Sequence, residues 1–378
     1  MEMEQIPPLF QEYPELAESI AWKEIGCLPS PVQKLNGLNY PDLWIKRDDL
    51  DCPLYGGNKI RKLEFTLAHA IKLNKSQIVT VGALGSNHCL ATAILAKKFG
   101  LKCSLILFYQ PVNARVRKQL LLFKHYGADI HYAGSMQNLA FHFYFLKRFQ
   151  YPSAYFLAPG GSSVRGTLGF VNAAFELKRQ IESGEMPLPE RIYIGLGSNG
   201  SMAGLILGLK FAGLDIPVYG VRVTRSHLGF VPLVGERGVR ALAFSVYKYL
   251  KLLKKDIPEI GEIEPRVIHD FLGYDYGYKT DKGSAAAQLM KETNGIELDP
   301  VYTAKTFAAV LECIKNNAGN SSAKKGPILY WHTYNCVNLD SEISGKDFHE
   351  LPAVFHRFFT EERDGSLDPS KFRPPPLR

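Results

Sequence analysis

The strongest constraint on the fold is an alternation of short apolar runs with longer helical patterns along the chain up to Arg225. The apolar runs predict strands over 43–46, 78–81, 103–108, 130–132, 191–195 and 218–223. Between them the hydrophobic spacing predicts helices over 59–72, 88–99, 114–126, 136–149, 164–181 and 202–212. Such alternation is typical of α/β proteins, in which helices cover both faces of parallel sheets.

After these elements the alternation weakens. The sequence still predicts helices over 284–292 and 302–315 and a strand over 328–331. Residues 316–325 have the composition of a loop. The tail 361–378 is charged and rich in proline, so we expect it to be flexible.

The composition narrows the class of protein. A chain of 378 residues is long enough for two or three domains. Because 46% of the residues are hydrophobic and 22% are charged, a disordered or collagen-like chain is excluded. The six cysteines form no C-x-x-C pair, which excludes a zinc ribbon and a thioredoxin-type motif. Scattered cysteines in a large chain favour a reducing, cytoplasmic location.

The net charge of +8 would suit a nucleic acid or an anionic small ligand as partner. The basic clusters at 115–118, 248–255 and 371–378 are not part of a nucleic-acid-binding motif, so we expect solvated faces and no nucleic-acid partner. No apolar run reaches the length of about 18 residues that a membrane span needs. The acidic N-terminus also lacks the order of a secretory signal.

The sharpest local motif is Gly56 and Gly57, followed by Asn58 and Lys59, at the predicted start of a helix. Glycines allow a tight backbone turn before a helix. A lysine amine near a positive helix terminus, or desolvated in a pocket, can have a lowered pKa and act as a nucleophile. Taken alone, the motif is more simply explained by a surface lysine in the first turn of a helix.

A second motif is the glycine-rich segment 195–204, which lies between a predicted strand and a predicted helix. Backbone N–H groups of residues 197–201 would surround an anion at the helix N-terminus. The dinucleotide fingerprint G-x-G-x-x-G also begins at Gly195, but the next strand ends without the acidic residue that this fingerprint expects. Arg225 lies there and would suit a 2′-phosphate, so a nicotinamide cofactor stays open.

Other segments carry weaker signals. Residues 85–88 and 158–163 offer hydroxyl, amide and N–H groups between a strand and a helix, although each is more simply explained as an N-cap. The tyrosine-rich stretch 273–278 and Tyr302 could stack, donate protons or fill a rim. His332 ends an apolar strand and is expected to be a core histidine. No histidine spacing resembles a metal site, so no metal is predicted.

In combination these segments resemble one family, the fold type II pyridoxal-phosphate enzymes, and within it the branch of D-cysteine desulfhydrase and 1-aminocyclopropane-1-carboxylate deaminase. The matching blocks keep the family's order and are residues 46–49, 56–64, 86–88, 159–162 with Gly169, 197–204, 276–277, 298–303 and 332–333. The resemblance implies two three-layer α/β domains with parallel sheets, similar to the β subunit of tryptophan synthase. It places a large domain at 1–62 and 176–360, with a small domain inserted at 63–175, and it implies a homodimer.

The resemblance also implies a role for each matching residue. Lys59 would carry pyridoxal 5′-phosphate as an internal aldimine and move the Cα proton of the substrate. Asn87 would hydrogen-bond the ring hydroxyl, and Thr333 would lie near the pyridine nitrogen. The phosphate would be bound by Gly197, Ser198, Asn199, Gly200 and Ser201. The substrate would be bound by Ser86, Asn87, His88, Tyr276 and Tyr302. Of these, Ser86, Tyr276 and Tyr302 would join Lys59 as catalytic residues.

Two positions separate the activities of this branch. The deaminase pattern has Glu and Leu where this chain has Thr303 and Thr333, which follow the desulfhydrase pattern. A hydroxyl at the ring nitrogen makes the cofactor a weaker electron sink than a carboxylate does, which suffices when thiolate is the leaving group. The resemblance therefore implies a lyase of amino-acid metabolism that eliminates sulfide from D-cysteine, leaving pyruvate and ammonia. The alternative is ring-opening deamination of 1-aminocyclopropane-1-carboxylate to 2-oxobutyrate and ammonia.

The chain departs from the family pattern at three glycines, which are replaced by Ala304, Tyr334 and Asn335. Tyr334 would lie beside the proposed site of the ring nitrogen, where its side chain would narrow the pocket or change the substrate. Two remoter alternatives stay open. A protein that binds pyridoxal phosphate without turnover is suggested by Tyr334, and a nicotinamide-dependent oxidoreductase rests only on residues 195–200.

Overall fold

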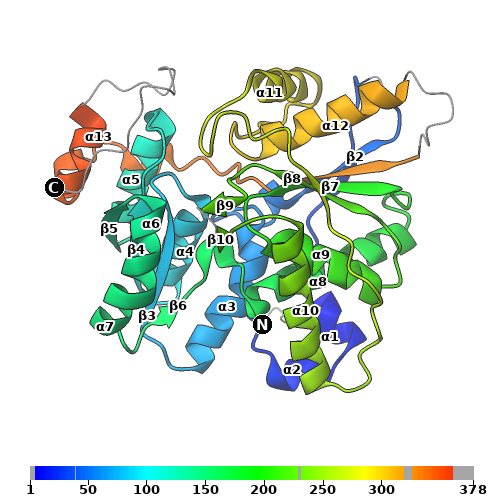
Figure 1. The fold of residues 1–378 in the computed structure, drawn as a ribbon, viewed down its shortest axis with the longest axis horizontal. Helices are drawn as coiled ribbons and strands as arrows, with labels where there is room; N and C mark the ends of the chain where they lie inside the picture. Colours follow the sequence, from blue (N-terminus) through cyan, green and yellow to red (C-terminus); the bar gives the residue numbers. More distant parts are fainter. Residues whose placement is uncertain (1–4, 39, 229–230, 319–325, 361–378) are drawn as a thin grey trace. The chain divides into compact units, whose positions relative to one another are not determined.

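The computed structural model describes residues 5–38, 40–228, 231–318 and 326–360 (Figure 1). By its internal contacts the chain divides into two units, each with a parallel sheet of its own. Unit 1 comprises the described residues up to Thr66 together with residues 162–336. Unit 2 comprises residues 67–161 and the described residues from Val337 onward.

Among the described residues, unit 1 contains a six-stranded sheet in the order β1-β2-β12-β7-β8-β11. The strands are β1 (Val32–Lys34), β2 (Leu43–Arg47), β7 (Arg191–Leu196), β8 (Val218–Arg222), β11 (Arg266–Ile268) and β12 (Ile328–His332). Neighbouring strands are parallel, except that β1 pairs antiparallel with β2. Every residue of β12 is buried between β2 and β7, which explains why its sequence is one continuous apolar run.

Helices pack on both faces of this sheet. The helices of unit 1 are α1 (Pro8–Glu12), α2 (Leu16–Ser19), α8 (Val164–Glu182), α9 (Gly200–Phe211), α10 (Glu236–Leu253), α11 (Asp281–Asn294) and α12 (Thr303–Ala318), and α3 (Lys59–Lys72) begins in it. Trp331 of β12 belongs to a core cluster with α8 and α9, whereas its neighbour Tyr330 belongs to a cluster with α11 and α12. Successive strand residues thus face opposite layers, which confirms the predicted three-layer α/β architecture.

Unit 2 contains a parallel sheet in the order β5-β4-β3-β6. Its strands are β3 (Gln77–Ala83), β4 (Lys102–Phe108), β5 (Ala128–Gly134) and β6 (Tyr155–Phe156). Its helices include α4 (Asn87–Lys98), α5 (Ala114–His125), α6 (Met136–Phe141) and α7 (Lys147–Gln150). The helix predicted over 136–149 is interrupted by a π-helical segment at His142–Leu146.

Residues 337–360 also belong to unit 2, because they pack against α5 and β5. Arg117 of α5 donates its Nε–H to the carbonyl oxygen of Phe358 at 2.7 Å. The ring of Tyr132 in β5 contacts the rings of Phe355 and Phe358. The elements of this segment are 3₁₀ turns at Asp340–Ile343, Phe348–Glu350 and Ala353–Phe355, followed by α13 (Arg357–Thr360).

The division into units differs from the predicted domains in three segments. Residues 63–66 and 162–175 lie in unit 1 rather than in the small domain, and residues 337–360 lie in unit 2 rather than in the large one. Helix α8 is continuous and packs along α9, so a boundary at residue 175 would divide one helix. The tail 361–378 and the loop residues 319–325 lie outside the described residues. None of the described helices is long and apolar enough to cross a membrane.

Candidate active site

Lys59, the predicted nucleophile, is the first residue of α3 and follows a tight turn that contains Gly57. Gly57 has φ of 97°, and a Cβ atom on it would lie 2.8 Å from the carbonyl oxygen of Tyr334. The turn therefore requires glycine for both its backbone angle and its space. The backbone N–H of Asn58 donates to the carbonyl oxygen of Thr333 at 3.3 Å, so the turn is held against the chain that follows β12.

The environment of Lys59 suits a nucleophilic amine. The side chain is half-buried, and loss of hydration lowers the pKa of its ammonium group to about 8. Within the described part of the chain, Lys59 Nζ has no hydrogen-bond or ion-pair partner. An amine with a lowered pKa is neutral more often near neutral pH, and only the neutral amine attacks a carbonyl carbon.

The predicted anion-binding segment forms the turn between β7 and α9, and α9 begins at Gly200. The N–H of Gly200 donates to Ser162 Oγ at 3.1 Å. The side chain of Asn199 donates to the carbonyl oxygen of Leu233 at 3.0 Å and accepts the N–H of Gly235 at 3.3 Å. Asn199 is thus tied through its amide to a neighbouring turn, so it would contribute its backbone to an anion site at this helix terminus.

Two residues without a predicted role in the anion site lie beside Gly200. A Cβ atom on Gly200 would lie 2.7 Å from Ser162 Oγ and 3.1 Å from Lys62 Nζ. Lys62 is fully buried, and desolvation together with the neighbouring Lys59 holds the pKa of its ammonium well below the usual range. A phosphate group bound beside Lys62 would favour the charged form of this amine. Its spacing of three residues from Lys59, on one face of α3, is the sequence signal that could have identified it.

Tyr276 and Tyr302 lie together in unit 1. Their hydroxyl oxygens are 2.9 Å apart, and their ring planes are nearly perpendicular. The ring of Tyr302 also covers the anion-binding turn, since a Cβ atom on Gly197 would lie 2.3 Å from Tyr302 Cε1. The next residue, Thr303, is buried and donates its hydroxyl to the Asp299 carboxylate at 2.9 Å. The same carboxylate accepts the backbone N–H groups of Tyr302 and Thr303, so Asp299 caps the start of α12.

Thr333 lies at the carboxyl ends of β12 and β7. A Cβ atom on Gly195 would be 4.0 Å from Thr333 Oγ1, which places this hydroxyl near the start of the anion-binding turn. Its neighbour His332 is completely buried, and burial lowers the pKa of its imidazole, which therefore stays neutral. His332 packs against Tyr330 in the sheet, in agreement with the core role expected for it.

Two predicted substrate-binding residues, Ser86 and His88, lie in unit 2 at the start of α4. Ser86 is the N-cap, and its Oγ accepts the N–H of Cys89 at 3.3 Å. His88 is buried, and its Nε2 lies 2.9 Å from Thr80 Oγ1 in the sheet. These bonds attach both side chains to the framework of unit 2.

Asn87, predicted to bind the cofactor ring, is the first residue of α4 and is held by two side chains of α5. Its Oδ1 accepts a hydrogen bond from Arg115 Nη2 at 2.8 Å and another from Gln119 Nε2 at 3.0 Å. With its carbonyl oxygen turned toward α5, the amide nitrogen is the atom of Asn87 suited to meet an acceptor such as a ring hydroxyl oxygen. Neither Arg115 nor Gln119 is marked by a motif in the sequence.

Arg225, which a nicotinamide 2′-phosphate would require, is engaged elsewhere. Its Nε donates to Asp275 Oδ1 at 2.8 Å, and its Nη2 donates to Asp275 Oδ2, in a bidentate ion pair. The structure therefore gives Arg225 a carboxylate partner within the protein.

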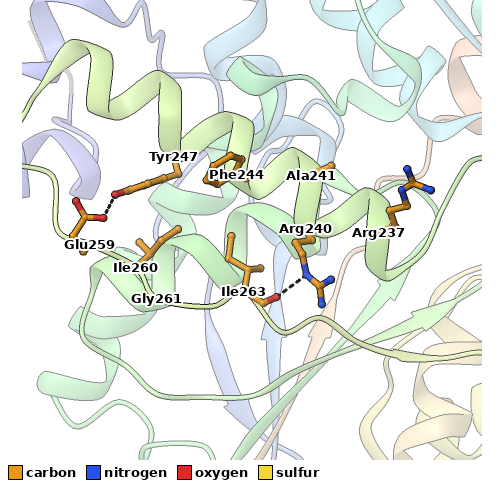
Figure 2. A pocket seen from close by; sticks show the side chains of 9 residues that line it. All are labelled: Arg237, Arg240, Ala241, Phe244, Tyr247, Glu259, Ile260, Gly261 and Ile263. Carbon is orange, nitrogen blue, oxygen red and sulfur yellow. Dashed lines mark hydrogen bonds between the residues drawn. The ribbon is translucent and has the colours of Figure 1, made fainter.

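A surface cavity of about 580 Å³ lies between α10 and the segment that follows it (Figure 2). Its lining residues are Arg237, Arg240, Ala241, Phe244, Tyr247, Glu259, Ile260, Gly261 and Ile263. Arg240 Nε donates to the carbonyl oxygen of Ile263 at 3.0 Å, and the Tyr247 hydroxyl donates to Glu259. None of the predicted catalytic or cofactor-binding residues lines this cavity, so it is separate from the candidate active site.

Residues 24–333 match the family of pyridoxal-phosphate dependent enzymes. The chain belongs to this family. Its cofactor is pyridoxal phosphate, as predicted, and the nicotinamide alternative is wrong.

Similar proteins place the chain in the predicted branch of that family. D-cysteine desulfhydrase of Salmonella paratyphi A is 31% identical, and the match covers 82% of this chain and 92% of that protein. The enzyme of the same name from Salmonella typhi is 30% identical with the same coverage.

Solved structures of other proteins have a similar fold. One titled an ACC deaminase homologue is 28% identical with a TM-score of 0.70, and covers 90% of this chain and 99% of its own. An L-serine ammonia-lyase from Rhizomucor miehei, 15% identical with a TM-score of 0.58, shares the fold over 85% of this chain and 100% of its own.

The residues of unit 1 fit this cofactor. A phosphate group matches the helix terminus at Gly200, with Lys62 and Ser162 beside it, because all three offer hydrogen-bond donors to an anion. An aldehyde matches Lys59, whose amine has a lowered pKa. The side chain of Asn58 donates to Ser201 Oγ at 3.3 Å, which joins the lysine turn to the anion-binding turn.

Proposed function

We propose that this protein is a pyridoxal-phosphate-dependent lyase that converts D-cysteine and water into pyruvate, ammonia and hydrogen sulfide. The observation that carries the proposal is the lowered pKa of Lys59 at a turn joined to the anion-binding helix terminus. Its support in sequence is the 31% identity to D-cysteine desulfhydrase of Salmonella paratyphi A. Thr333 adds to it, because a hydroxyl at that position follows the desulfhydrase pattern.

Binding uses groups from several elements. The N–H groups of residues 197–201 and the amine of Lys62 would bind the cofactor phosphate. Asn87 would donate its amide N–H to the ring hydroxyl oxygen, and Thr333 would lie near the ring nitrogen. Ser86, at the N-terminus of α4, binds the substrate carboxylate, because a hydroxyl at a helix N-terminus suits an anion.

The chemical steps use Lys59 and the two tyrosines. Pyridoxal phosphate, when bound, draws electrons from the α-carbon of the amino acid. Lys59 Nζ accepts the proton from that carbon, and the C–S bond then breaks with its electron pair going to sulfur. Tyr276 and Tyr302, whose hydroxyls are hydrogen-bonded to each other at 2.9 Å, orient the substrate on this side. Because thiolate is a good leaving group, no carboxylate is needed at the ring nitrogen.

Deamination of 1-aminocyclopropane-1-carboxylate is the second candidate. Its support is the TM-score of 0.70 to the structure titled an ACC deaminase homologue. The two activities give different keto acids, pyruvate from D-cysteine and 2-oxobutyrate from the cyclopropane.

The test is to incubate the cofactor-loaded protein with D-cysteine, L-cysteine or 1-aminocyclopropane-1-carboxylate and to identify the keto acid by chromatography. Pyruvate from D-cysteine, at a kcat/KM at least about tenfold above that for the other two, is the expected result. Preferred release of 2-oxobutyrate would establish the deaminase instead. Bound cofactor without any keto acid would establish a binding protein without turnover.

We also propose that the enzyme is a cytoplasmic homodimer. All six cysteines are free thiols, which suits a reducing compartment. The dimer rests on the family resemblance. Light scattering of the cofactor-loaded protein should give twice the chain mass of 42.3 kDa, and the mass of one chain would contradict it.

A further inference from the structure

Tyr276 lies in residues 269–280, a segment of unit 1 without helix or strand. The backbone of this segment therefore makes none of the repeating hydrogen bonds that position a side chain in regular structure. If Tyr276 is to meet Tyr302 in one geometry, side chains from neighbouring elements must hold the segment.

The first such contact is a shared carboxylate. Asp275 accepts two hydrogen bonds from the guanidinium of Arg225, just after β8, and its Oδ1 also accepts the backbone N–H of Tyr276 at 2.7 Å. A bidentate pair fixes the plane of the carboxylate, and that plane fixes the direction of the Tyr276 amide. Arg225 thus acts on the peptide that carries the tyrosine.

The second contact comes from α12. Lys305 is fully buried, and its Nζ donates to the carbonyl oxygen of Leu272 at 2.7 Å. Tyr302 immediately precedes α12, and its backbone N–H donates to Asp299 Oδ1 at 2.8 Å. Helix α12, which directly follows Tyr302, therefore also binds the segment that carries Tyr276, through Lys305.

We infer that Arg225 and Lys305 are positioning residues that hold Tyr276 against Tyr302. The inference rests on the proposed function, in which these tyrosines orient the substrate. Arg225 and Lys305 act at Asp275 and at Leu272, two points ahead of Tyr276. Loss of either contact frees the segment to move, and displacement of a positioned group by about 1 Å can cost up to a hundredfold in rate.

The test compares Arg225→Gln, Arg225→Lys and Lys305→Met with wild type, all loaded with cofactor. Arg266→Gln is the matched control, because Arg266 is also exposed in unit 1 and donates to a tyrosine hydroxyl, that of Tyr219, at 3.0 Å. Hydrogen exchange measured by mass spectrometry reports the segment 269–280 without any need for turnover. The kcat and KM for D-cysteine measure the effect on catalysis, and the dissociation constant of pyridoxal phosphate measures the effect on cofactor binding.

In Arg225→Gln and Lys305→Met we expect exchange of segment 269–280 to rise about tenfold and kcat to fall about tenfold, with cofactor affinity unchanged. Arg225→Lys keeps the charge but not the bidentate geometry, so it should recover part of kcat. The control should match wild type in every measurement.

Unchanged exchange in both variants would overturn the inference, whatever the substrate proves to be. Faster exchange with unchanged kcat and KM would overturn the positioning role. Failure of wild type to act on D-cysteine would overturn the proposed function instead, and the exchange result would still decide whether the two residues hold the segment.

Discussion

The reactivity assigned to Lys59 follows from its loss of water. An exposed lysine has a pKa of about 10.4, whereas the pKa of Lys59 is about 8. Because only the neutral amine attacks the cofactor aldehyde, the reactive fraction of Lys59 rises with pH and reaches one half near the lowered pKa.

We predict that the rate at which cofactor-free protein takes up pyridoxal phosphate covalently rises with pH, with a midpoint of about 8. Rapid-mixing absorbance at a series of pH values measures it, and Lys59→Ala should show no covalent uptake. A midpoint near the ordinary lysine value of about 10.4 would contradict the account.

The turn before Lys59 gives a second prediction at the residue scale. Gly57→Ala adds a Cβ atom that would lie 2.8 Å from the Tyr334 carbonyl oxygen, so the turn must shift and carry Lys59 with it. We expect the affinity for pyridoxal phosphate to fall at least about tenfold, measured by absorbance titration.

Gly184→Ala is the matched control for this change. Gly184 also has a positive φ, of 79°, but a Cβ atom there meets nothing within 4 Å. It should cost only the backbone strain of about 1 kcal/mol and leave cofactor affinity unchanged. Equal loss of affinity in both variants would show that contact at Gly57 is unimportant.

At the scale of elements, a buried ion cluster joins three elements of unit 1. Glu176 of α8 accepts hydrogen bonds from Lys46 of β2 and Arg61 of α3, and all three side chains are buried. The two cations hold the pKa of Glu176 at about 2, although burial alone would raise it. Arg61 lies two residues after Lys59 on α3, so the cluster supports the helix that carries Lys59.

We predict that Glu176→Gln lowers the free energy of unfolding by about 3–5 kcal/mol at neutral pH. The change removes the carboxylate that pairs with buried Lys46 and leaves Arg61 with Asp48 as its carboxylate partner. The folded pKa lies below the unfolded one, so this contribution is present above the unfolded value of about 4.5 and is lost as pH falls toward about 2. Urea unfolding at neutral pH and at about pH 3 measures both effects.

Glu182→Gln, on the exposed end of the same helix, is the control and should change the unfolding free energy by less than about 0.5 kcal/mol. If the two variants were equally stable, the buried cluster would not contribute as argued.

Periodicity predicted the elements whose own residues form a clear hydrophobic pattern. The strands β3, β4 and β7 are continuous apolar runs, and periodicity places them within one or two residues at most ends. Strands β1 and β11 were not predicted, because each has only three residues and none is buried. Helix α10 was not predicted either, although its buried residues recur at helical spacing on one face.

At the scale of the whole molecule, the sequence identified the family, its cofactor and its fold. The predictions for the candidate site rest on local motifs, as at Lys59 and at residues 197–201. Lys62 and the pair of Arg225 with Asp275 were not predicted, because their roles depend on partners that only the folded chain supplies. Long-range contacts between single polar residues leave no pattern in one sequence.

The domain boundaries also depend on long-range contacts that a single sequence does not reveal. Residues 337–360 join unit 2 through single contacts, such as the bond from Arg117 to the Phe358 carbonyl, that connect parts of the chain far apart in sequence. No composition change marks that return.

The central claim, that Lys59 makes this chain a D-cysteine lyase, is tested most directly by comparing wild type with Lys59→Ala for release of sulfide and pyruvate from D-cysteine. Wild type loaded with cofactor should release both in equal amounts, and Lys59→Ala should lose at least about a thousandfold in kcat. Retention of wild-type turnover by Lys59→Ala, or no release of sulfide by wild type with bound cofactor, would contradict the account.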